Sequence, residues 1–280
     1  MKEKHVRKTT FGRAVALSAI AALALAGCGN SAGTTTTAAA KSSGFVPPSL
    51  KALDKLGTPE GSVNVLAWPG YVEDGSNDKS VDWVTDFEKS SGCQVNIKTF
   101  GTSDEAVQLM RTGQYDTVSA SGDATLRLIA AGDVEPVNTS LITNYPDIFP
   151  ALKNKPWNSV KNVPYGIPHG RGANLLMYRT DKVSPAPDSW SAVFSGGSAY
   201  KGGVTAYDSP IYIADAALYL MKTIPALGIT NPYALDAKQL AAAVGLLKTQ
   251  KANVGEYWSD YLKETQAFKA GSSVIGTTWQ

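Results

Sequence analysis

From residue 62 onward, short strand-like runs of apolar residues alternate with segments in which apolar residues recur at helical spacing. Strands that alternate with helices of this length are typical of a parallel, doubly wound α/β sheet. In the first half of this region, the expected strands are 63–66, 95–97 and 116–119, and the expected helices are 81–90, 102–113 and 124–131. The second of these helices opens with Thr102-Ser-Asp-Glu105, which predicts a capping box.

A second alternating series begins near residue 173 and runs to the last residue, Gln280. Its expected strands are 173–178, 204–206, a run near 254 and 273–276, and its expected helices are 188–194, 211–222, 237–248 and 260–270. The two series predict two α/β lobes, 61–168 and 169–280, with a hinge within 165–172. Because the sequence stops directly after the last expected strand, we expect that strand to be an open edge and the fold to need further chain.

The first residues predict where the protein works. A basic start is followed by an apolar run, 14–26, which is shorter than the roughly 20 residues of a membrane-spanning helix. This order predicts a secretory signal over 1–27 and an exported mature protein. The run ends in Leu25-Ala-Gly-Cys28, which resembles the lipobox of bacterial lipoproteins and implies a lipid on the Cys28 sulfur. The alternative is an ordinary signal peptide that contains a cysteine.

Residues 28–60 predict a flexible tether between the lipid and the folded part. From 29 to 44 they are mostly Ser, Ala, Gly and Thr, a composition that cannot bury a core. We therefore expect a monomer at the outer face of the cell membrane or in the periplasm, attached to the membrane through its lipid.

Charge and cysteine content narrow the classes of partner. Residues 1–27 carry five of the 26 basic and one of the 24 acidic residues, so the remaining chain has a net charge near −2. This balance does not favour a nucleic-acid partner, which needs a clustered basic face. With Cys28 lipidated, Cys93 has no partner, and no disulfide is expected.

Catalytic groups are scarce after the signal, where His169 is the only histidine. A serine or cysteine triad would need His169 as its base, and a zinc site would need more nitrogen or sulfur ligands than the sequence contains. No phosphate loop or nucleophile elbow is present. We expect no cofactor and no metal, and a structural role for His169, with catalysis by His169 as the alternative.

Aromatic and polar residues gather directly after expected strands, at the edge where open α/β sheets bind ligands. Trp68 and Tyr71 follow the first strand, and Ser121 and Asp123 follow the third. The candidates for ligand binding are Trp68, Tyr71, Ser121, Asp123, Asp208, Ser209, Tyr212 and Trp279. Aspartates that begin helices also cap them, so both roles stay open for Asp123 and Asp208.

This combination of groups suits a polyamine, which is an apolar chain that carries separated ammonium groups. Ring faces can cover its methylenes and attract its charges by roughly 0.5 to 2 kcal/mol each, and carboxylates can accept charge-assisted hydrogen bonds. The remaining tryptophans are expected to serve packing: Trp83, Trp157, Trp190 and Trp258.

Four segments of this chain resemble the spermidine/putrescine-binding proteins of ABC importers, a branch of the extracytoplasmic solute-binding proteins. They are Trp68-Pro-Gly-Tyr-Val-Glu-Asp-Gly, Asp82-Trp-Val-Thr-Asp-Phe-Glu-Lys-Ser-Ser-Gly-Cys, Ser119-Ala-Ser-Gly-Asp-Ala and Tyr207-Asp-Ser-Pro-Ile-Tyr. The resemblance implies the two-lobed type II periplasmic-binding-protein fold, with its return to the first lobe missing here. It also implies a permease and ATPase complex as partner.

By position, the resemblance implies that Trp68 and Tyr71 form aromatic walls, that Ser121 is a polar contact and that Trp279 faces them from the other lobe. Asp123 stands where some relatives have an aromatic residue. Ser209 and Tyr212 stand where known spermidine binders have acidic residues, with Asp208 one position earlier. The expected function is therefore polyamine capture for import, without catalysis. The alternatives are another small solute and an exported enzyme that uses the same cleft.

Overall fold

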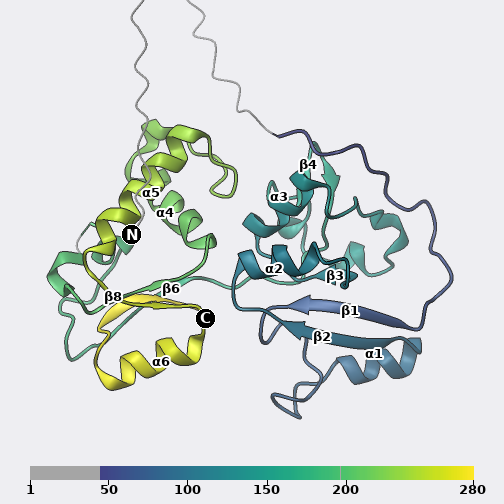
Figure 1. Cartoon of the computed structure of the whole chain (residues 1–280), viewed down its shortest axis with the longest axis horizontal. Helices are drawn as coiled ribbons and strands as arrows, with labels where there is room; N and C mark the ends of the chain where they lie inside the picture. Colours follow the sequence, from purple (N-terminus) through teal and green to yellow (C-terminus); the bar gives the residue numbers. More distant parts are fainter. Residues whose placement is uncertain (1–44, 196) are drawn as a thin grey trace, which may run out of the picture. The chain divides into compact units, whose positions relative to one another are not determined.

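The computed structural model describes residues 45–195 and 197–280 (Figure 1). The expected signal and Cys28 lie outside the described residues. In the described part of the expected tether, residues 45–60 contain no helix or strand. No helix in the described ranges has the length and apolar character needed to cross a membrane.

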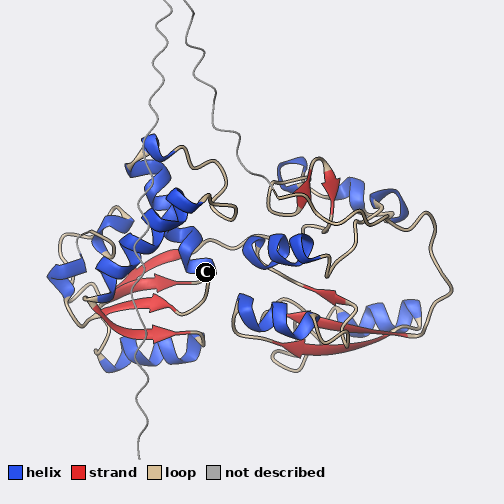
Figure 2. Cartoon of the chain, turned by 45° about the horizontal axis from the view of Figure 1, so that its top comes forward, coloured by secondary structure: helices blue, strands red, loops and turns tan. Residues whose placement is uncertain are grey.

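The first strand-helix series forms a parallel three-stranded sheet with the strand order β2-β1-β3 (Figures 1 and 2). Its strands are β1 (Ser62–Ala67), β2 (Gln94–Thr99) and β3 (Thr117–Val118), and its helices are α1 (Val84–Ser91), α2 (Ser103–Met110) and α3 (Gly122–Ala131). The parallel sheet predicted from the alternating pattern is confirmed here. Helices α2 and α3 cover it through buried Val107, Ala124 and Leu128, while Leu66 of β1 packs against Phe100.

Two helix starts differ from the expected positions because local hydrogen bonds fix them. Helix α1 begins three residues later than expected, after Trp83, because the Trp83 and Val84 amides both donate to the Glu73 carbonyl. At the start of α2, the Thr102 hydroxyl accepts from the Glu105 amide as predicted. However, the Glu105 carboxylate reaches past Thr102 and accepts from the Gly101 amide at 2.9 Å, so the expected reciprocal capping box is wrong by one residue.

A mixed four-stranded sheet with the order β6-β9-β7-β8 organises the second series. Its strands are β6 (Leu175–Tyr178), β7 (Val204–Tyr207), β8 (Val254–Trp258) and β9 (Ile275–Thr278), and its α-helices are α4 (Ile211–Thr223), α5 (Ala237–Lys251) and α6 (Tyr261–Ala270). Strands β7, β8 and β9 are parallel, as expected, but β6 runs antiparallel to β9. Figure 2 shows the strands of this sheet in red.

The position of β9 corrects the expectation of an open edge. This last strand lies inside the sheet, hydrogen-bonded to β6 on one side and to β7 on the other. Gly276 in β9 permits this close pairing, because a Cβ there would overlap the side chain and carbonyl of Thr205. The edges of the sheet are β6 and β8.

The remaining elements are short. The hairpin strands are β4 (Ser159–Val160) and β5 (Val163–Pro164), and the 3-10 turns are η1 (Thr139–Leu141), η2 (Tyr145–Asp147), η3 (Pro150–Leu152), η4 (Trp190–Ala192), η5 (Gly197–Tyr200) and η6 (Pro225–Leu227). The helix expected at 188–194 is only the turn η4, capped by the Ser189 hydroxyl. The stretch 165–174, which contains the expected hinge, has no helix or strand.

The largest core of the described residues belongs to the second series. Trp258 and Phe194 are fully buried there, together with Ile275 of the central strand. Packing roles are confirmed for Trp258 and for Trp190, which is half-buried against this core. The core fixes the carboxyl ends of β7 and β9, where several candidate ligand residues lie.

Candidate functional site

A cleft of about 1660 Å³ is lined by residues of both series. Four of the candidate ligand residues line it: Trp68, Tyr71, Ser121 and Trp279. Each follows the carboxyl end of a strand, the first pair after β1, Ser121 after β3 and Trp279 after β9. The structure therefore brings these four side chains to one space, as expected from their positions after strand ends.

Aromatic rings from both series meet at the cleft. The rings of Trp68 and Trp279 lie edge to face, with centroids 6.0 Å apart and planes at 73°. Phe100 supports Trp68 at 4.5 Å, while Tyr207 and Trp258 support Trp279 at 5.2 and 5.1 Å. These contacts hold both indoles in place, and both remain only half-buried. Such rings can present apolar faces and electron-rich surfaces to a ligand.

Tyr71 stacks on His169, with ring centroids 5.6 Å apart and planes at 29°. The Trp83 ring also lies near His169, with centroids 6.4 Å apart. The expected packing role of Trp83 is only partial, since 48% of the residue is exposed. This cluster gives His169 aromatic neighbours, and the stacking contact supports the Tyr71 ring at the cleft. Among the described residues, no group of three or more His, Cys, Asp or Glu side chains could hold a metal ion.

Ser121 and Asp123 form a local pair at the start of α3. The Ser121 hydroxyl donates to Asp123 Oδ1 at 2.7 Å, and it does not cap the helix. Asp123 lies inside the first turn, so it is not the capping residue either. Its other oxygen, Oδ2, is buried and has no hydrogen-bond partner among the described residues. A buried carboxylate oxygen without a donor is costly, and a donor from a bound ligand would satisfy it.

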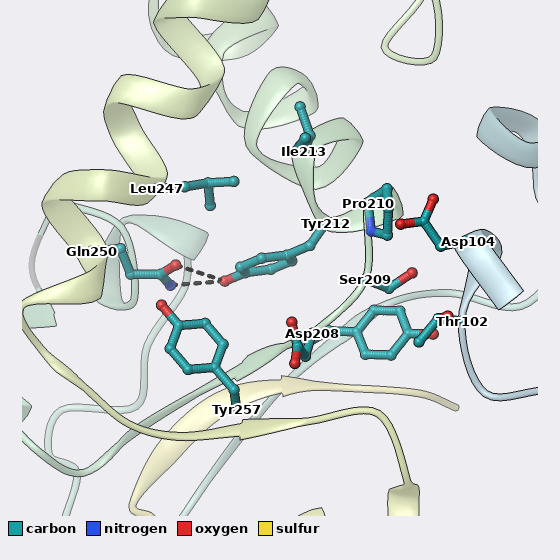
Figure 3. Close-up of a pocket in the computed structure, with 11 residues that line it drawn as sticks. Thr102, Asp104, Asp208, Ser209, Pro210, Tyr212, Ile213, Leu247, Gln250 and Tyr257 are labelled. Carbon is teal, nitrogen blue, oxygen red and sulfur yellow. Dashed lines mark hydrogen bonds between the residues drawn. The ribbon is translucent and has the colours of Figure 1, made fainter. Parts of the chain in front are cut away.

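The remaining four candidates do not line the large cleft, and Asp123 lies just behind its lining residues Ser121 and Gly122. Asp208, Ser209 and Tyr212 line a separate cavity of about 400 Å³ beside the start of α2 (Figure 3). The Tyr212 hydroxyl donates to Gln250 Oε1 at 3.1 Å and accepts from Gln250 Nε2 at 2.8 Å, in the core between α4 and α5. Burial also raises the pKa of Tyr212 well above its usual value. The structure therefore places Tyr212 in packing.

Asp208 and Ser209 occupy the turn between β7 and α4. Asp208 is exposed and does not cap α4, whose N-cap is Pro210. The Ser209 hydroxyl accepts from the Ser103 amide at 3.3 Å and lies 3.2 Å from the Ser103 hydroxyl. Ser209 thus joins the start of α4 to the start of α2.

Several residues that line the cleft were not predicted from the sequence, and Asp215 is the most consequential of them. It lies in the second turn of α4 and accepts two hydrogen bonds from Asn174 Nδ2, at 2.9 and 3.0 Å. Burial, together with the negative charge of Asp123 and against the hydrogen bond from Asn174, raises the pKa of Asp215 to about 6. One signal was available, because Asp215 is the only charged residue between Ile211 and Met221.

Trp157 and Tyr233 also line the cleft, so Trp157 is not confined to the expected packing role. Their rings meet edge to face with centroids 6.0 Å apart. Both side chains lie close to Gly122, where a Cβ would be 2.8 Å from Trp157 Cβ and 2.9 Å from Tyr233 Cδ2. Gly122 therefore lets these rings approach the start of α3, beside Ser121 and Asp123.

Residues 82–280 match a family described as bacterial extracellular solute-binding protein. The chain belongs to this family. Its solute-binding relatives include the spermidine/putrescine-binding periplasmic protein of Escherichia coli K12, which is 26% identical over 216 residues, 76% of this chain and 56% of that protein. Another is the putrescine-binding periplasmic protein SpuD of Pseudomonas aeruginosa, 27% identical over 188 residues, 63% of this chain and 49% of that protein. The chain thus spans about half the length of these curated relatives.

Solved solute-binding proteins share the fold. A spermidine/putrescine ABC transporter substrate-binding protein from Streptococcus pneumoniae superimposes with a TM-score of 0.54 at 19% identity, covering 78% of this chain and 62% of that one. An ABC transporter substrate-binding protein from Bradyrhizobium japonicum gives 0.52 at 18% identity, covering 78% and 63%. The expected α/β fold of type II periplasmic binding proteins is confirmed.

Proposed function

We propose that the protein captures a polyamine, such as putrescine or spermidine, for an ABC importer and releases it chemically unchanged. The arrangement of Trp68, Trp279 and Asp123 carries this proposal: two indoles meet at a cleft beside a buried carboxylate oxygen that has no donor among the described residues. Methylenes of a polyamine can lie against the rings, and an ammonium can donate to the carboxylate. The names of the curated relatives support the same class of ligand.

The predicted division of the chain gives this capture a mechanism. We propose that lobes 61–168 and 169–280 close on the ligand around residues 165–172, since the rings come from strand ends in both lobes. Ser121 would hold Asp123 in position, and Tyr71, backed by His169, would form a further wall. The turn that contains Asp208 and Ser209 would help to hold the closed state, because the Ser209 hydroxyl accepts a hydrogen bond from the Ser103 amide of the other lobe.

We further propose that the mature protein is a monomer that a lipid on Cys28 attaches to the membrane. It would lie at the outer face of the cell membrane or in the periplasm and would deliver its ligand to a permease and ATPase complex. The motif that ends at Cys28 motivates the anchor. Growth with a labelled fatty acid should label the wild type and leave Cys28→Ala unlabelled. Equal labelling of both would rule out this anchor.

Calorimetry on the full-length protein tests the ligand class. Putrescine and spermidine should bind, whereas an uncharged diol of the same length and a dicarboxylate should not. Binding of the diol or the dicarboxylate, without the amines, would overturn the polyamine assignment. Turnover of a bound amine that is lost in His169→Ala would overturn the claim that the protein is not an enzyme.

A further inference from the structure

Helix α4 presents a carboxylate to the cleft from an otherwise apolar stretch. The neighbours of Asp215 in the sequence, Ala214 and Ala216, are buried in the core, whereas Asp215 lines the cleft together with Leu218 and Tyr219. Asp215 therefore lies on the side of α4 that faces the cleft, not on the side that packs in the core. Its side chain is oriented by Asn174, the residue that precedes β6.

The hydrogen bonds of Asp215 leave room for another donor. Both of its oxygens accept from the single Nδ2 group of Asn174. An ionised carboxylate has about four acceptor positions, so further donors can still be accommodated. Within the described ranges, neither Asp215 nor Asp123 forms an ion pair with a lysine or arginine.

Groups from several elements surround this carboxylate. Asp123 of α3 acts on it with a like charge, and Asn174 donates to it. Burial raises the pKa values of Tyr207 of β7 and of Tyr233, for Tyr233 to about 12, and the charges of both aspartates act in the same direction. The two phenols therefore stay neutral and bring no negative charge, and helices α3 and α4, which carry the two aspartates, are in contact. Elsewhere, the cleft is lined by charged side chains of both signs: Asp116, Asp133, Glu135, Lys155, Arg171 and Lys222.

We propose that Asp215 binds an ammonium group of the ligand together with Asp123, so that a carboxylate from α4 and one from α3 hold the same cation. This inference rests on the proposed function and adds to it a residue that determines specificity. One cation offsets the repulsion between two partly buried carboxylates, and it supplies a donor to Asp123 Oδ2. Because α3 and α4 belong to different series, the same contact would couple ligand binding to lobe closure.

The proposal predicts a pH dependence of affinity. Aliphatic ammonium groups titrate near pH 10, so the ligand keeps its charge between about pH 5 and pH 8. Asp215, in contrast, gains a proton as the pH falls through about 6. Only the ionised carboxylate attracts the ammonium. The affinity for the amine should therefore be constant well above pH 6 and should decrease as the pH falls below about 6.

Putrescine titrations of the full-length protein between about pH 5 and pH 8 test this. Asp215→Asn should weaken binding by about tenfold or more near pH 7.5, as expected for loss of a charge-assisted hydrogen bond, and should lose the decline in affinity below pH 6. Asn174→Ala should bind well at high pH, but its decline should begin at a higher pH, because the hydrogen bond that lowers the pKa of Asp215 is gone. Asp86→Asn, at an exposed position of α1, is the matched control and should behave as the wild type.

The outcomes separate the two proposals. If the wild type binds putrescine and Asp215→Asn binds it equally well with the same pH profile, the role of Asp215 is wrong and the proposed function stands. An unchanged pH profile in Asn174→Ala would likewise contradict the role of Asp215. If the wild type binds no amine at any pH, the proposed function fails, and this inference fails with it.

Discussion

The Tyr207 hydroxyl donates a hydrogen bond of 2.9 Å to the Gly101 carbonyl, which lies 106 residues earlier in the chain. This bond joins the end of β7 in the second series to the loop before α2 in the first. Burial raises the pKa of Tyr207 well above its usual value, so the phenol keeps its proton and remains a donor at any physiological pH. The same ring packs edge to face on Trp279.

Tyr207→Phe should therefore lower the free energy of unfolding by about 1 kcal/mol, because the ring contacts remain and only the hydrogen bond is lost. Denaturant titration measures the change. Tyr261→Phe, at a position that is 47% exposed, serves as control and should leave stability unchanged. Equal stability of Tyr207→Phe and the wild type would show that the bond to Gly101 contributes nothing.

Trp68→Ala should weaken putrescine binding by more than about 1 kcal/mol, since it removes a stacking face for methylenes and a cation–π contact. Trp83→Ala is the matched control, because Trp83 neighbours His169 but does not line the cleft. It should leave affinity unchanged and act on stability alone. Calorimetry separates the two effects, and similar losses of affinity in both variants would contradict the assignment of Trp68 as a wall.

Glu264 should make the protein less stable as the pH rises. The residue is buried, Oε1 has no hydrogen-bond partner among the described residues, and Thr278 donates to Oε2 at 3.2 Å. Burial raises the pKa of Glu264 from 4.5 to about 7, against this hydrogen bond. Between these two values the folded state binds more protons than the unfolded state, so stability falls with rising pH and becomes constant above 7.

Melting temperatures of Glu264→Gln and the wild type, measured from pH 5 to pH 8, test this linkage. The variant should lose the decline and should melt at a higher temperature than the wild type at pH 8. Glu60→Gln, at an exposed position, should follow the wild type. Parallel curves for Glu264→Gln and the wild type would show that Glu264 does not titrate in this range.

Gly122→Ala should destabilise the fold by about 1 to 3 kcal/mol, because the added methyl would overlap Trp157 and Tyr233, where a Cβ has only 2.8 and 2.9 Å of room. Gly245→Ala is the matched control in α5, where a Cβ meets nothing within 4 Å. It should stabilise the protein by roughly 0.5 to 1 kcal/mol, since alanine favours helix. Denaturant titration gives both values, and a neutral Gly122→Ala would mean that the two rings can move aside.

The class of fold, and the position of Trp68 and Trp279 at the cleft, could be predicted from the sequence alone. Alternation of apolar runs with helical segments predicts a parallel α/β sheet because each such segment must bury one face. Trp68 and Trp279 were predictable because residues that follow parallel strands emerge at one edge of a sheet, whatever the order of the strands.

The strand order, and the identity of the carboxylates at the cleft, follow from long-range packing and could not be predicted from the sequence. Strand β9 is internal because β6 pairs with it in the antiparallel direction, and such pairing between distant segments leaves no local pattern. Tyr212 and Asp215 are three residues apart on α4, yet Tyr212 is bonded to Gln250 in the core and Asp215 lines the cleft. Which of them faces the cleft depends on how α5 packs against α4, a contact between side chains 38 residues apart that the periodicity of α4 alone does not contain.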